Sequence, residues 1–308
     1  MAARRAAVLA GHVVVAREAS DLRPSGVSSP GGLVAVVTGG SRGIGHGCAL
    51  ALAKAGAVVY ITGRSAQDAV AEKINAEVNA AQGKGRALAL VCDHADDAST
   101  EAAFQRVLKE QGRIDVLVNN ATTGAAAKGK GKFWEQSPGF YDGFMNVGLR
   151  SHFVCSTIAA RDMVKRGGGV IVNISSFGAV LPYNSIPYAM GKTALDRMTA
   201  DAALELREHN VAMVSLYPGL VKTEGVLARM GERVAKSKNA ETPEFVGRAA
   251  VALATDSNVI QKSGKALIAQ ELADAYGFTD VEGNVPRDKV MRGLRQTMAR
   301  PPPHWVLE

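Results

Sequence analysis

The 308-residue sequence contains only three cysteines, Cys48, Cys92 and Cys155, and they lie far apart along the chain. An odd and widely spaced set does not suit a disulfide framework or a zinc site, and it favours a reducing compartment. Long apolar runs are also missing, since the longest, residues 6–16, contains His12 and is shorter than the ~20 residues that cross a bilayer. We therefore predict no bound metal and no transmembrane segment.

Aromatic residues are scarce as well: the sequence has eight Phe, six Tyr and two Trp. This is a poor supply for a stacking platform that binds single-stranded nucleic acid. The formal net charge is +7, but no helix-turn-helix, zinc-finger or RNA-binding signature accompanies it. We interpret the charge as a mildly basic surface and expect neither a nucleic-acid nor a membrane partner.

The two ends of the chain differ in composition from the middle. Residues 1–17 carry three Arg and no acidic residue, as in an organellar presequence, and a Pro/Ser/Gly-rich stretch follows up to Gly32. An N-terminal extension is therefore expected over 1–32, either disordered or targeting, in a protein that is cytoplasmic or sent to a mitochondrion or another organelle. Residues 286–308 include three consecutive prolines and are expected to form a C-terminal tail.

Between these ends, apolar stretches alternate with helical periodicity. The expected strands cover 33–39, 57–63, 87–93, 114–120, 170–176, 211–219 and 264–269, and the expected helices cover 47–56, 68–81, 99–111, 139–165, 188–208 and 243–255. Continuous apolar strands separated by helices indicate a parallel sheet that is covered on both faces. The predicted fold is α/β, a Rossmann-type doubly wound parallel sheet forming a single domain over 33–285.

A glycine-rich turn, Thr38–Gly45, follows the first expected strand and opens the first expected helix. Glycines there permit a tight turn and let backbone N–H groups approach a pyrophosphate at the positive end of the helix. NAD enzymes place a carboxylate at the end of the second strand, but no acidic residue occurs between Asp21 and Asp68. Arg64 stands there instead. With Arg42 it suits a 2′-phosphate, which favours NADP(H) over NAD(H).

Tyr188 and Lys192 are spaced so that they share one face of a helix. A free phenol has a pKa of ~10, and a neighbouring ammonium group favours the phenolate. The pair is therefore expected to act as a general acid for carbonyl reduction and as a base for alcohol oxidation. Ser175 and Ser176 precede it at the end of the fifth expected strand.

The order and spacing of these motifs, G-x-x-x-G-x-G, N-N-A, Y-x-x-x-K and P-G-x-x-x-T, resemble the short-chain dehydrogenase/reductase family over about residues 33–275. The resemblance implies an NADP(H)-dependent oxidoreductase that interconverts a carbonyl and a secondary alcohol, with a steroid, ketone or xenobiotic-like substrate. A non-catalytic NADP(H)-binding sensor or scaffold, and an NAD(H)-dependent dehydrogenase of the same family, are the alternatives.

The resemblance also assigns residues. It makes Asn146, Tyr188, Lys192 and one of the two serines catalytic: strand alignment selects Ser176, which we favour, whereas counting back from Tyr188 selects Ser175. Thr122 stands where the family has a glycine after N-N-A. The residues expected to bind the cofactor are Thr38, Gly39, Ser41, Arg42, Gly43, Ile44, Gly45, Arg64, Asp93, Asn120, Ala121, Tyr188, Lys192, Pro218, Gly219, Val221 and Thr223.

Three segments are expected to shape the substrate pocket: 122–141, 178–187 and 224–241. The last occupies the position where the family usually has a mobile lid. The family resemblance further implies a homodimer or homotetramer that assembles through the helices expected over 139–165 and 188–208.

Overall fold

The computed structural model describes residues 32–123 and 132–298. The presequence-like residues 1–17, most of the expected N-terminal extension and residues 299–308 lie outside the described residues. The core is a seven-stranded sheet in the order β3-β2-β1-β4-β5-β6-β7, in which all neighbouring strands are parallel. Its strands are β1 (Val34–Val37), β2 (Val58–Gly63), β3 (Arg86–Val91), β4 (Val116–Asn119), β5 (Gly169–Ile174), β6 (Val211–Tyr217) and β7 (Ala266–Ile268). The predicted doubly wound parallel sheet is confirmed.

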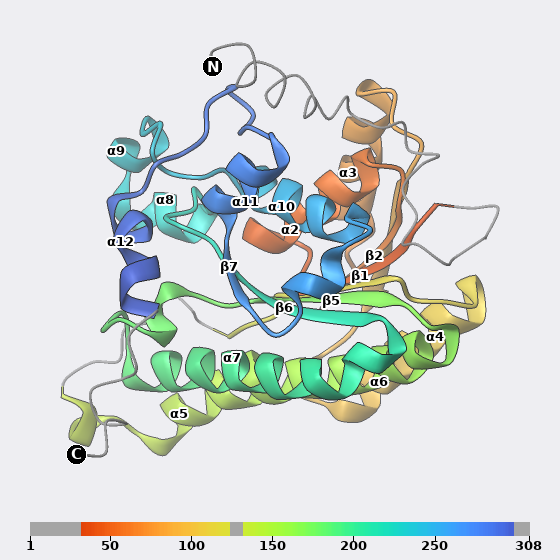
Figure 1. Ribbon diagram of the computed structural model, residues 1–308, viewed down its shortest axis with the longest axis horizontal. Coiled ribbons are helices and arrows are strands. Elements are labelled where there is room, and N and C mark those ends of the chain that lie inside the picture. The colour runs from red at the N-terminus through yellow and green to blue at the C-terminus, as the bar shows by residue number, and fades with distance from the viewer. Residues whose placement is uncertain (1–31, 124–131, 299–308) are drawn as a thin grey trace, which may run out of the picture.

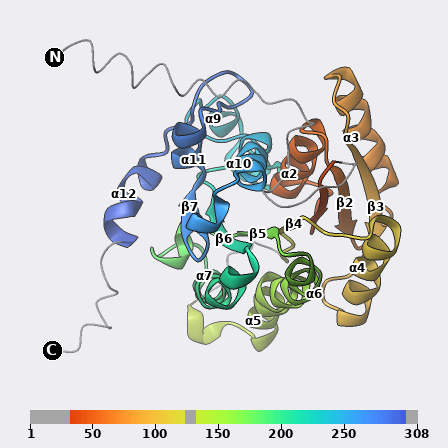
Figure 2. The ribbon, with the colours of Figure 1, turned by 45° about the vertical axis from the view of Figure 1, so that its right-hand side comes forward.

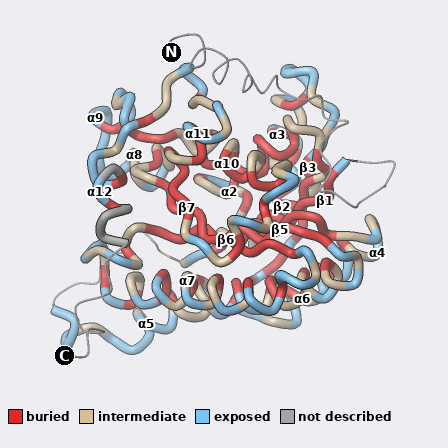
Figure 3. The backbone as a smooth tube through the Cα atoms, in the orientation of Figure 1, coloured by how far each residue is buried: buried red, intermediate tan, exposed pale blue. Residues whose placement is uncertain are grey.

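Helices cover both faces of the sheet (Figure 1). One face packs against α2 (Gly43–Lys54), α3 (Asp68–Ala80), α10 (Pro243–Thr255) and α11 (Ala269–Tyr276), and the other against α4 (Asp97–Gln111), α6 (Ser151–Arg166) and α7 (Ile186–Leu206). Successive strand side chains point to opposite faces, so Val37 joins the first core and Val36 the second. Buried residues therefore fill the centre of the molecule, while the outer sides of the helices are exposed (Figure 3).

Short polar residues and prolines set where several helices begin. Ser185 caps α7 by accepting a hydrogen bond from the backbone N–H of Tyr188 at 3.4 Å, and Thr242 caps α10 by accepting one from Phe245 at 3.1 Å. Pro187 and Pro243 lie in the first turns of these helices, where their missing N–H groups have no intrahelical partner to lose. The sequence thereby fixes the start of the helix that carries Tyr188.

The helix expected over 139–165 is interrupted. The chain forms α5 (Pro138–Met145), then a π-helical turn (Asn146–Arg150), then α6. In this turn the N–H of Ser151 donates to the carbonyl of Asn146, and the Ser151 hydroxyl donates to the carbonyl of Val147 at 2.6 Å. Single π-turns inside helices occur frequently at functional sites, and this one begins at a residue that the family resemblance singles out.

Three helices from the C-terminal part of the chain lie at one end of the molecule. Here lie α8 (Glu224–Met230), α9 (Glu232–Ala235) and α12 (Lys289–Met298) (Figures 1 and 2). Helix α12 falls within the region expected to be a tail, yet its Met291 and Leu294 are buried in a cluster with Tyr217, against which Phe177 packs. Within the described ranges, no helix combines the length and the apolar character needed to span a membrane.

Candidate active site

The glycine turn is joined to the end of β4 by a set of hydrogen bonds. The Thr38 hydroxyl oxygen accepts the N–H groups of Asn120 and Ala121 at 2.9 and 3.0 Å. The Asn120 side-chain amide in turn donates to the carbonyls of Thr38 and Gly39 at 2.9 and 3.1 Å. Strands β1 and β4 are neighbours at the point where the strand order reverses, which is where ligands of open α/β sheets bind. These contacts hold one wall of that crevice in shape.

The turn itself requires glycine at specific positions. Gly39 and Gly43 have φ values of +63° and +55°, in the left-handed region that residues with a Cβ atom rarely adopt. A Cβ atom on Gly45 would lie 2.3 Å from the Gly39 carbonyl oxygen, so only glycine lets the helix approach the turn this closely. The Gly39 N–H donates to the Thr62 hydroxyl at 3.1 Å, which ties the turn to β2.

The N-terminus of α2 already binds an anionic group of the chain. The Gly43 N–H donates to a carboxylate oxygen of Glu224 at 3.0 Å, and Arg42 occupies the N-cap position with its side chain exposed. Positive ends of helices favour anions because their backbone N–H groups lack partners. The donors therefore fit a pyrophosphate. Of the other residues predicted here, Ser41 is half-buried in the turn, and Ile44 packs against the core.

Two further predicted residues follow the ends of β2 and β3. Arg64 is exposed directly after β2, and Asp93 is exposed two residues after β3, where its carboxylate accepts the N–H of Ala95 at 3.0 Å. Since the strands are parallel, their ends meet at one edge of the sheet. The structure therefore brings Arg64, Asp93 and the glycine turn to the same edge, as expected.

The chemical groups lie on and beside α7. Lys192 is buried, and its Nζ donates to the Ile174 carbonyl at 2.7 Å and lies 5.9 Å from the centroid of the Tyr188 ring. A side-chain hydrogen bond links Ser176 to Tyr188, and the Ser176 Oγ also accepts the Gly178 N–H at 3.1 Å. The buried Ser175 side chain interacts instead with Asp196 and Tyr217. The geometry thus groups Ser176, rather than Ser175, with Tyr188 and Lys192.

Burial dominates the protonation of this pair. It raises the pKa of Tyr188 to about 12, although the hydrogen bond from Ser176 acts in the opposite direction. It lowers the pKa of Lys192 to about 8, while the negative charge of Asp196 raises it. The sequence predicted that the ammonium group would lower the Tyr188 pKa. In the structure the larger effect is loss of solvent, which disfavours a phenolate.

Asn146 also reaches this end of the molecule. It begins the π-helical turn, and that turn packs against both α5 and α7. Two aromatic rings border Tyr188: the centroid of Phe144 lies 6.0 Å from that of Tyr188, and the centroid of Tyr183 lies 6.2 Å from it. Tyr183 belongs to the segment 178–187 that was expected to line the substrate pocket. Residues 124–131 of the segment 122–141 lie outside the described residues.

The loop after β6 completes the crevice. Pro218 is buried, and the Thr223 hydroxyl caps α8 by accepting the N–H of Val226 at 3.3 Å. A Cβ atom built on Gly43 would lie 3.3 Å from the Thr223 methyl group, so this loop touches the glycine turn. Val221 forms a parallel bridge with Glu241. The two halves of the predicted site therefore meet across the carboxyl edge of the sheet.

Comparison with known proteins identifies the family. The family model described as short chain dehydrogenase matches residues 33–232. The chain belongs to the short-chain dehydrogenase family. Its members are oxidoreductases whose reactions depend on NAD(P), and the resemblance predicted from the motifs is confirmed.

Three relatives illustrate this membership. The mouse protein named dehydrogenase/reductase SDR family member 1 is 45% identical over 273 residues, which cover 83% of this chain and 86% of that protein. The 7alpha-hydroxysteroid dehydrogenase of Clostridium sardiniense is 33% identical over 222 residues, covering 70% of this chain and 82% of that protein. A crystal structure of 3-oxoacyl-[acyl-carrier protein] reductase from Brucella melitensis in complex with NAD superposes with a TM-score of 0.68, at 29% identity, over 77% of this chain and 95% of that one.

Several residues around the crevice of this short-chain dehydrogenase escaped the motif analysis. His94 is buried, its Nε2 lies 2.7 Å from the Thr62 hydroxyl, and burial lowers its pKa to about 4. Glu224 contacts the glycine turn, and Glu241 contacts the loop after β6. In the sequence, His94, Glu224 and Glu241 each lie within or directly after a polar stretch, a pattern typical of residues exposed to solvent. Only the partners, which are more than 20 residues away in the chain, make them part of the site.

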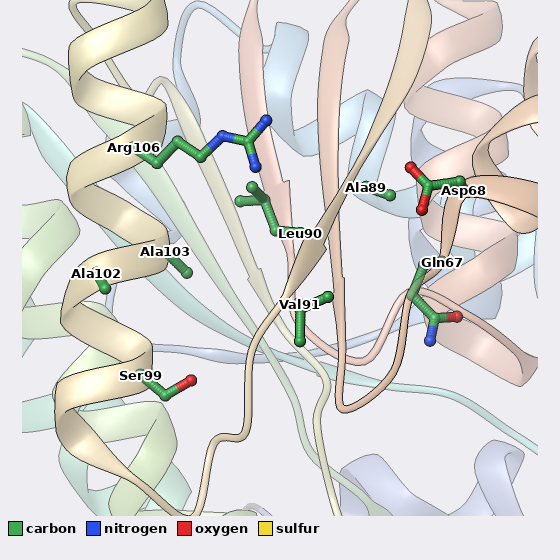
Figure 4. A pocket seen from close by; sticks show the side chains of 9 residues that line it. All are labelled: Gln67, Asp68, Ala89, Leu90, Val91, Ser99, Ala102, Ala103 and Arg106. Atoms are coloured by element: carbon green, nitrogen blue, oxygen red, sulfur yellow. The ribbon is translucent and has the colours of Figure 1, made fainter.

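A separate hollow lies on the outer edge of the sheet, between the start of α3 and α4 (Figure 4). Leu90 and Val91 of the edge strand β3 form its floor, and Arg106 of α4 borders it. All the residues that line it come from the range 67–106. It is therefore distinct from the crevice of the short-chain dehydrogenase that contains Tyr188.

Proposed function

We propose that this short-chain dehydrogenase interconverts a carbonyl compound and a secondary alcohol with NADP(H), using Tyr188 as the general acid and base. One observation carries the proposal. The Tyr188 phenol is hydrogen-bonded to Ser176, has the buried Lys192 ammonium beside its ring, and stands at the end of the sheet that holds the glycine turn.

The residues present suit a dinucleotide. The N-terminus of α2 would hold the pyrophosphate in the place where it now binds Glu224, and the loop from Pro218 to Thr223 would hold the nicotinamide end. Exposed Arg64 and Arg42, without a carboxylate at the end of β2, support NADP(H) over NAD(H). When bound, the nicotinamide supplies or accepts the hydride.

The side chains of this chain handle the proton. With a pKa of about 12, Tyr188 keeps its proton at neutral pH and can donate it to a carbonyl oxygen that is being reduced. Ser176 is placed to hold that oxygen through its hydroxyl. With a pKa of about 8, Lys192 is mainly charged at neutral pH and stabilises the phenolate that remains after proton transfer.

The surroundings of Tyr188 favour an apolar carbonyl substrate, such as a steroid, ketone or xenobiotic. Phe144 and Tyr183 present their rings edge-on to Tyr188, and Tyr183 is 46% exposed, so its ring can contact a substrate. Large apolar side chains are also exposed on the long helices, including Phe153 on α6 and Leu204 on α7. They support assembly of a homodimer or homotetramer through these helices.

Replacing Tyr188 by Phe tests the proposal. We expect the rate of carbonyl reduction at saturating substrate to fall by about 100- to 10,000-fold, the usual contribution of a positioned general acid. NADPH affinity should change little, because the ring remains. The measurement is NADPH absorbance over a panel of ketones. Tyr276→Phe is the matched control, since it removes a phenol hydroxyl that donates to Asp256 at the C-terminal end of α10. Undiminished turnover in Tyr188→Phe would refute the assignment.

The two serines can be separated in the same assay. Ser176→Ala should lose turnover because it removes the hydroxyl beside Tyr188, whereas Ser175→Ala should affect mainly stability. The reverse order would assign the role to Ser175. A wild-type protein that binds NADPH but reduces nothing on the panel would favour the alternative of a sensor or scaffold.

A further inference from the structure

Glu241 lies directly behind the loop that follows β6, and its side chain is completely buried. Its backbone pairs with this loop like a short strand. The Lys222 N–H donates to the Glu241 carbonyl at 2.8 Å, and the Glu241 N–H donates to the Leu220 carbonyl at 2.8 Å. The position of Glu241 is thus fixed by the main chain, and its side chain must point into the protein.

The carboxyl group of Glu241 binds the backbone of this loop. Its Oε1 accepts the Gly219 N–H at 2.9 Å and the Gln270 side-chain amide at 3.0 Å. A Cβ atom on Gly219 would lie 2.8 Å from this oxygen, so the backbone rests on it without space between them. The other oxygen, Oε2, is buried and finds no hydrogen-bond partner among the described residues.

The same carboxyl group connects the loop to the C-terminal part of the chain, beyond the residues that the family model matches. Gln270 of α11 donates to Glu241 and accepts the backbone N–H of Asp288 at 3.2 Å. Next to Glu241, the Thr242 N–H donates to the carboxylate of Asp280 at 3.0 Å. Asp288 immediately precedes α12, so these contacts run from the loop after β6 to the last described helix.

The arrangement suits a neutral carboxyl group. Two donors meet Oε1, no residue in the described ranges donates to Oε2, and a buried charge that is only partly compensated is costly. The pKa of Glu241 is raised to about 8, chiefly by burial and in small part by the negative charges of Asp288 and Asp280, whereas the hydrogen bonds from Gln270 and Gly219 lower it. The charged residues on the elements around it are Lys222 on the loop, Glu244 and Arg248 on α10, Glu271 and Asp274 on α11, and Asp280, Glu282, Arg287 and Asp288 on the segment before α12.

We propose that Glu241 is a positioning residue for the nicotinamide end of the cofactor. Its neutral carboxyl group holds Gly219, and with it the loop from Pro218 to Thr223, in the shape that receives the nicotinamide, and links that loop through Gln270 to the segment before α12. A charged Glu241 is stabilised by contact with water, so its ionisation favours movement of the loop away from it. This role rests on the proposed function, in which the same loop binds the nicotinamide.

The variant Glu241→Gln tests the role, because a glutamine side chain reproduces a neutral carboxyl in shape and keeps an acceptor for Gly219. Two probes are titrated calorimetrically between pH 6.5 and 9.5, chosen as values on either side of about 8. One is NADPH and the other is 2′-phospho-ADP-ribose, which has no nicotinamide. For the wild type we expect NADPH affinity to fall above pH 8 by up to about tenfold per pH unit, since one proton is linked to binding.

The variant should show no such fall, and the nicotinamide-free probe should show none in either protein. Glu205→Gln is the matched control, because it removes an exposed carboxylate on α7 and should keep the wild-type profile. Glu241→Ala, which loses the acceptor altogether, should weaken NADPH at every pH while its binding of 2′-phospho-ADP-ribose shows that the fold is intact.

Two results would overturn the proposal. If Glu241→Gln keeps the wild-type pH dependence, another group causes it, and Lys192 with its pKa of about 8 is the obvious one. If both probes lose affinity equally in Glu241→Ala, the residue supports the fold as a whole rather than the nicotinamide end. A wild type that binds neither probe refutes the proposed function instead.

The ionisation itself has a readout that needs no nucleotide. The folded protein holds the Glu241 proton up to about pH 8, whereas the unfolded chain releases it near 4.5. Stability therefore falls as the pH rises from about 4.5 to about 8 and then levels off. Thermal unfolding of Glu241→Gln should lack this decrease relative to the wild type.

Discussion

The two halves of the crevice are built from different kinds of polar group. Where the glycine turn meets β2 and β4, the hydrogen bonds are made by backbone N–H groups, by the hydroxyls of Thr38 and Thr62 and by the amide of Asn120. None of these groups titrates in the physiological range. Around Tyr188 lie the buried Lys192 and its half-buried neighbour Asp196, both of which can change charge. One half contains neutral groups that hold the chain in a shape, and the other contains the titratable groups to which we assign the proton transfer.

Asp196 shows how closely the second half is coupled. It lies one helical turn after Lys192 on α7, and the hydroxyl of Tyr217 donates a hydrogen bond to it. Burial raises the pKa of Asp196, and the charges of Asp196 and Lys192 each favour the ionised form of the other. A change in the charge of one of these groups therefore shifts the pKa of the other, whereas the neutral hydrogen bonds between the glycine turn and β2 and β4 involve no such coupling.

The largest expected effect that follows from this contrast is at Lys192. Lys192→Met should lower turnover by about 100- to 10,000-fold, because Tyr188 loses the cation that stabilises its phenolate. In the wild type, turnover should fall as the pH rises through about 8, where Lys192 loses its proton. Steady-state rates against pH measure both effects. Lys165→Met, at an exposed position near the end of α6, is the control. Full activity of Lys192→Met would contradict our assignment of the proton transfer to the titratable groups around Tyr188.

A smaller effect is expected at Arg64, in the nucleotide half. Arg64→Asp should weaken NADPH binding by about 10- to 100-fold and improve NADH binding, because charged hydrogen bonds contribute about 1.5–3 kcal/mol. The pH profile of turnover at saturating cofactor should not move. The measurement is the dissociation constant of NADPH and of NADH for each protein. Arg86→Asp, at the amino end of β3, should leave both constants unchanged. Equal NADPH affinity in Arg64→Asp would contradict the preference for NADP(H).

The smallest effect concerns the shape of the glycine turn. Thr62→Val removes the acceptor of the Gly39 N–H and should weaken NADPH and NADH alike by about tenfold, the cost of leaving one buried donor unpaired. Turnover at saturation and its pH dependence should match the wild type. Binding titrations and a pH series test this together. A shifted pH profile would show that the two halves are not separable.

Much of the architecture was predictable from local pattern. Apolar runs in β1, β2 and β6 were recognisable because a strand buried on both faces has no polar side to interrupt it. The glycine turn and the Tyr188–Lys192 spacing were recognisable because each imposes a short-range constraint, a left-handed backbone in one case and a shared helix face in the other. The interruption at Asn146 was not, since the residues of the π-helical turn continue an ordinary helical periodicity.

The choice between the serines needed coordinates for a related reason. Ser175 and Ser176 are adjacent at the end of an extended strand, so their side chains point to opposite sides, and a shift of one residue exchanges their roles. From the sequence, the choice between the serines depended on the assumed length of the loop between them and Tyr188. In the structure Ser176 hydrogen-bonds with Tyr188, whereas Ser175 lies beside Asp196, and these contacts support our preference for Ser176.

The sequence by itself determined the sheet, the glycine turn, the spacing of Tyr188 and Lys192 on one helix and the family, because each depends on residues that are close along the chain or on a regular alternation. Tertiary structure alone decided which carboxyl groups are buried. Glu241 and Asp196 differ from ordinary surface acids only through partners such as Gly219 and Tyr217, which folding brings to them from distant segments. Solvent exclusion, and with it the shift of a pKa, is a property of the folded surroundings and leaves no mark in the local pattern.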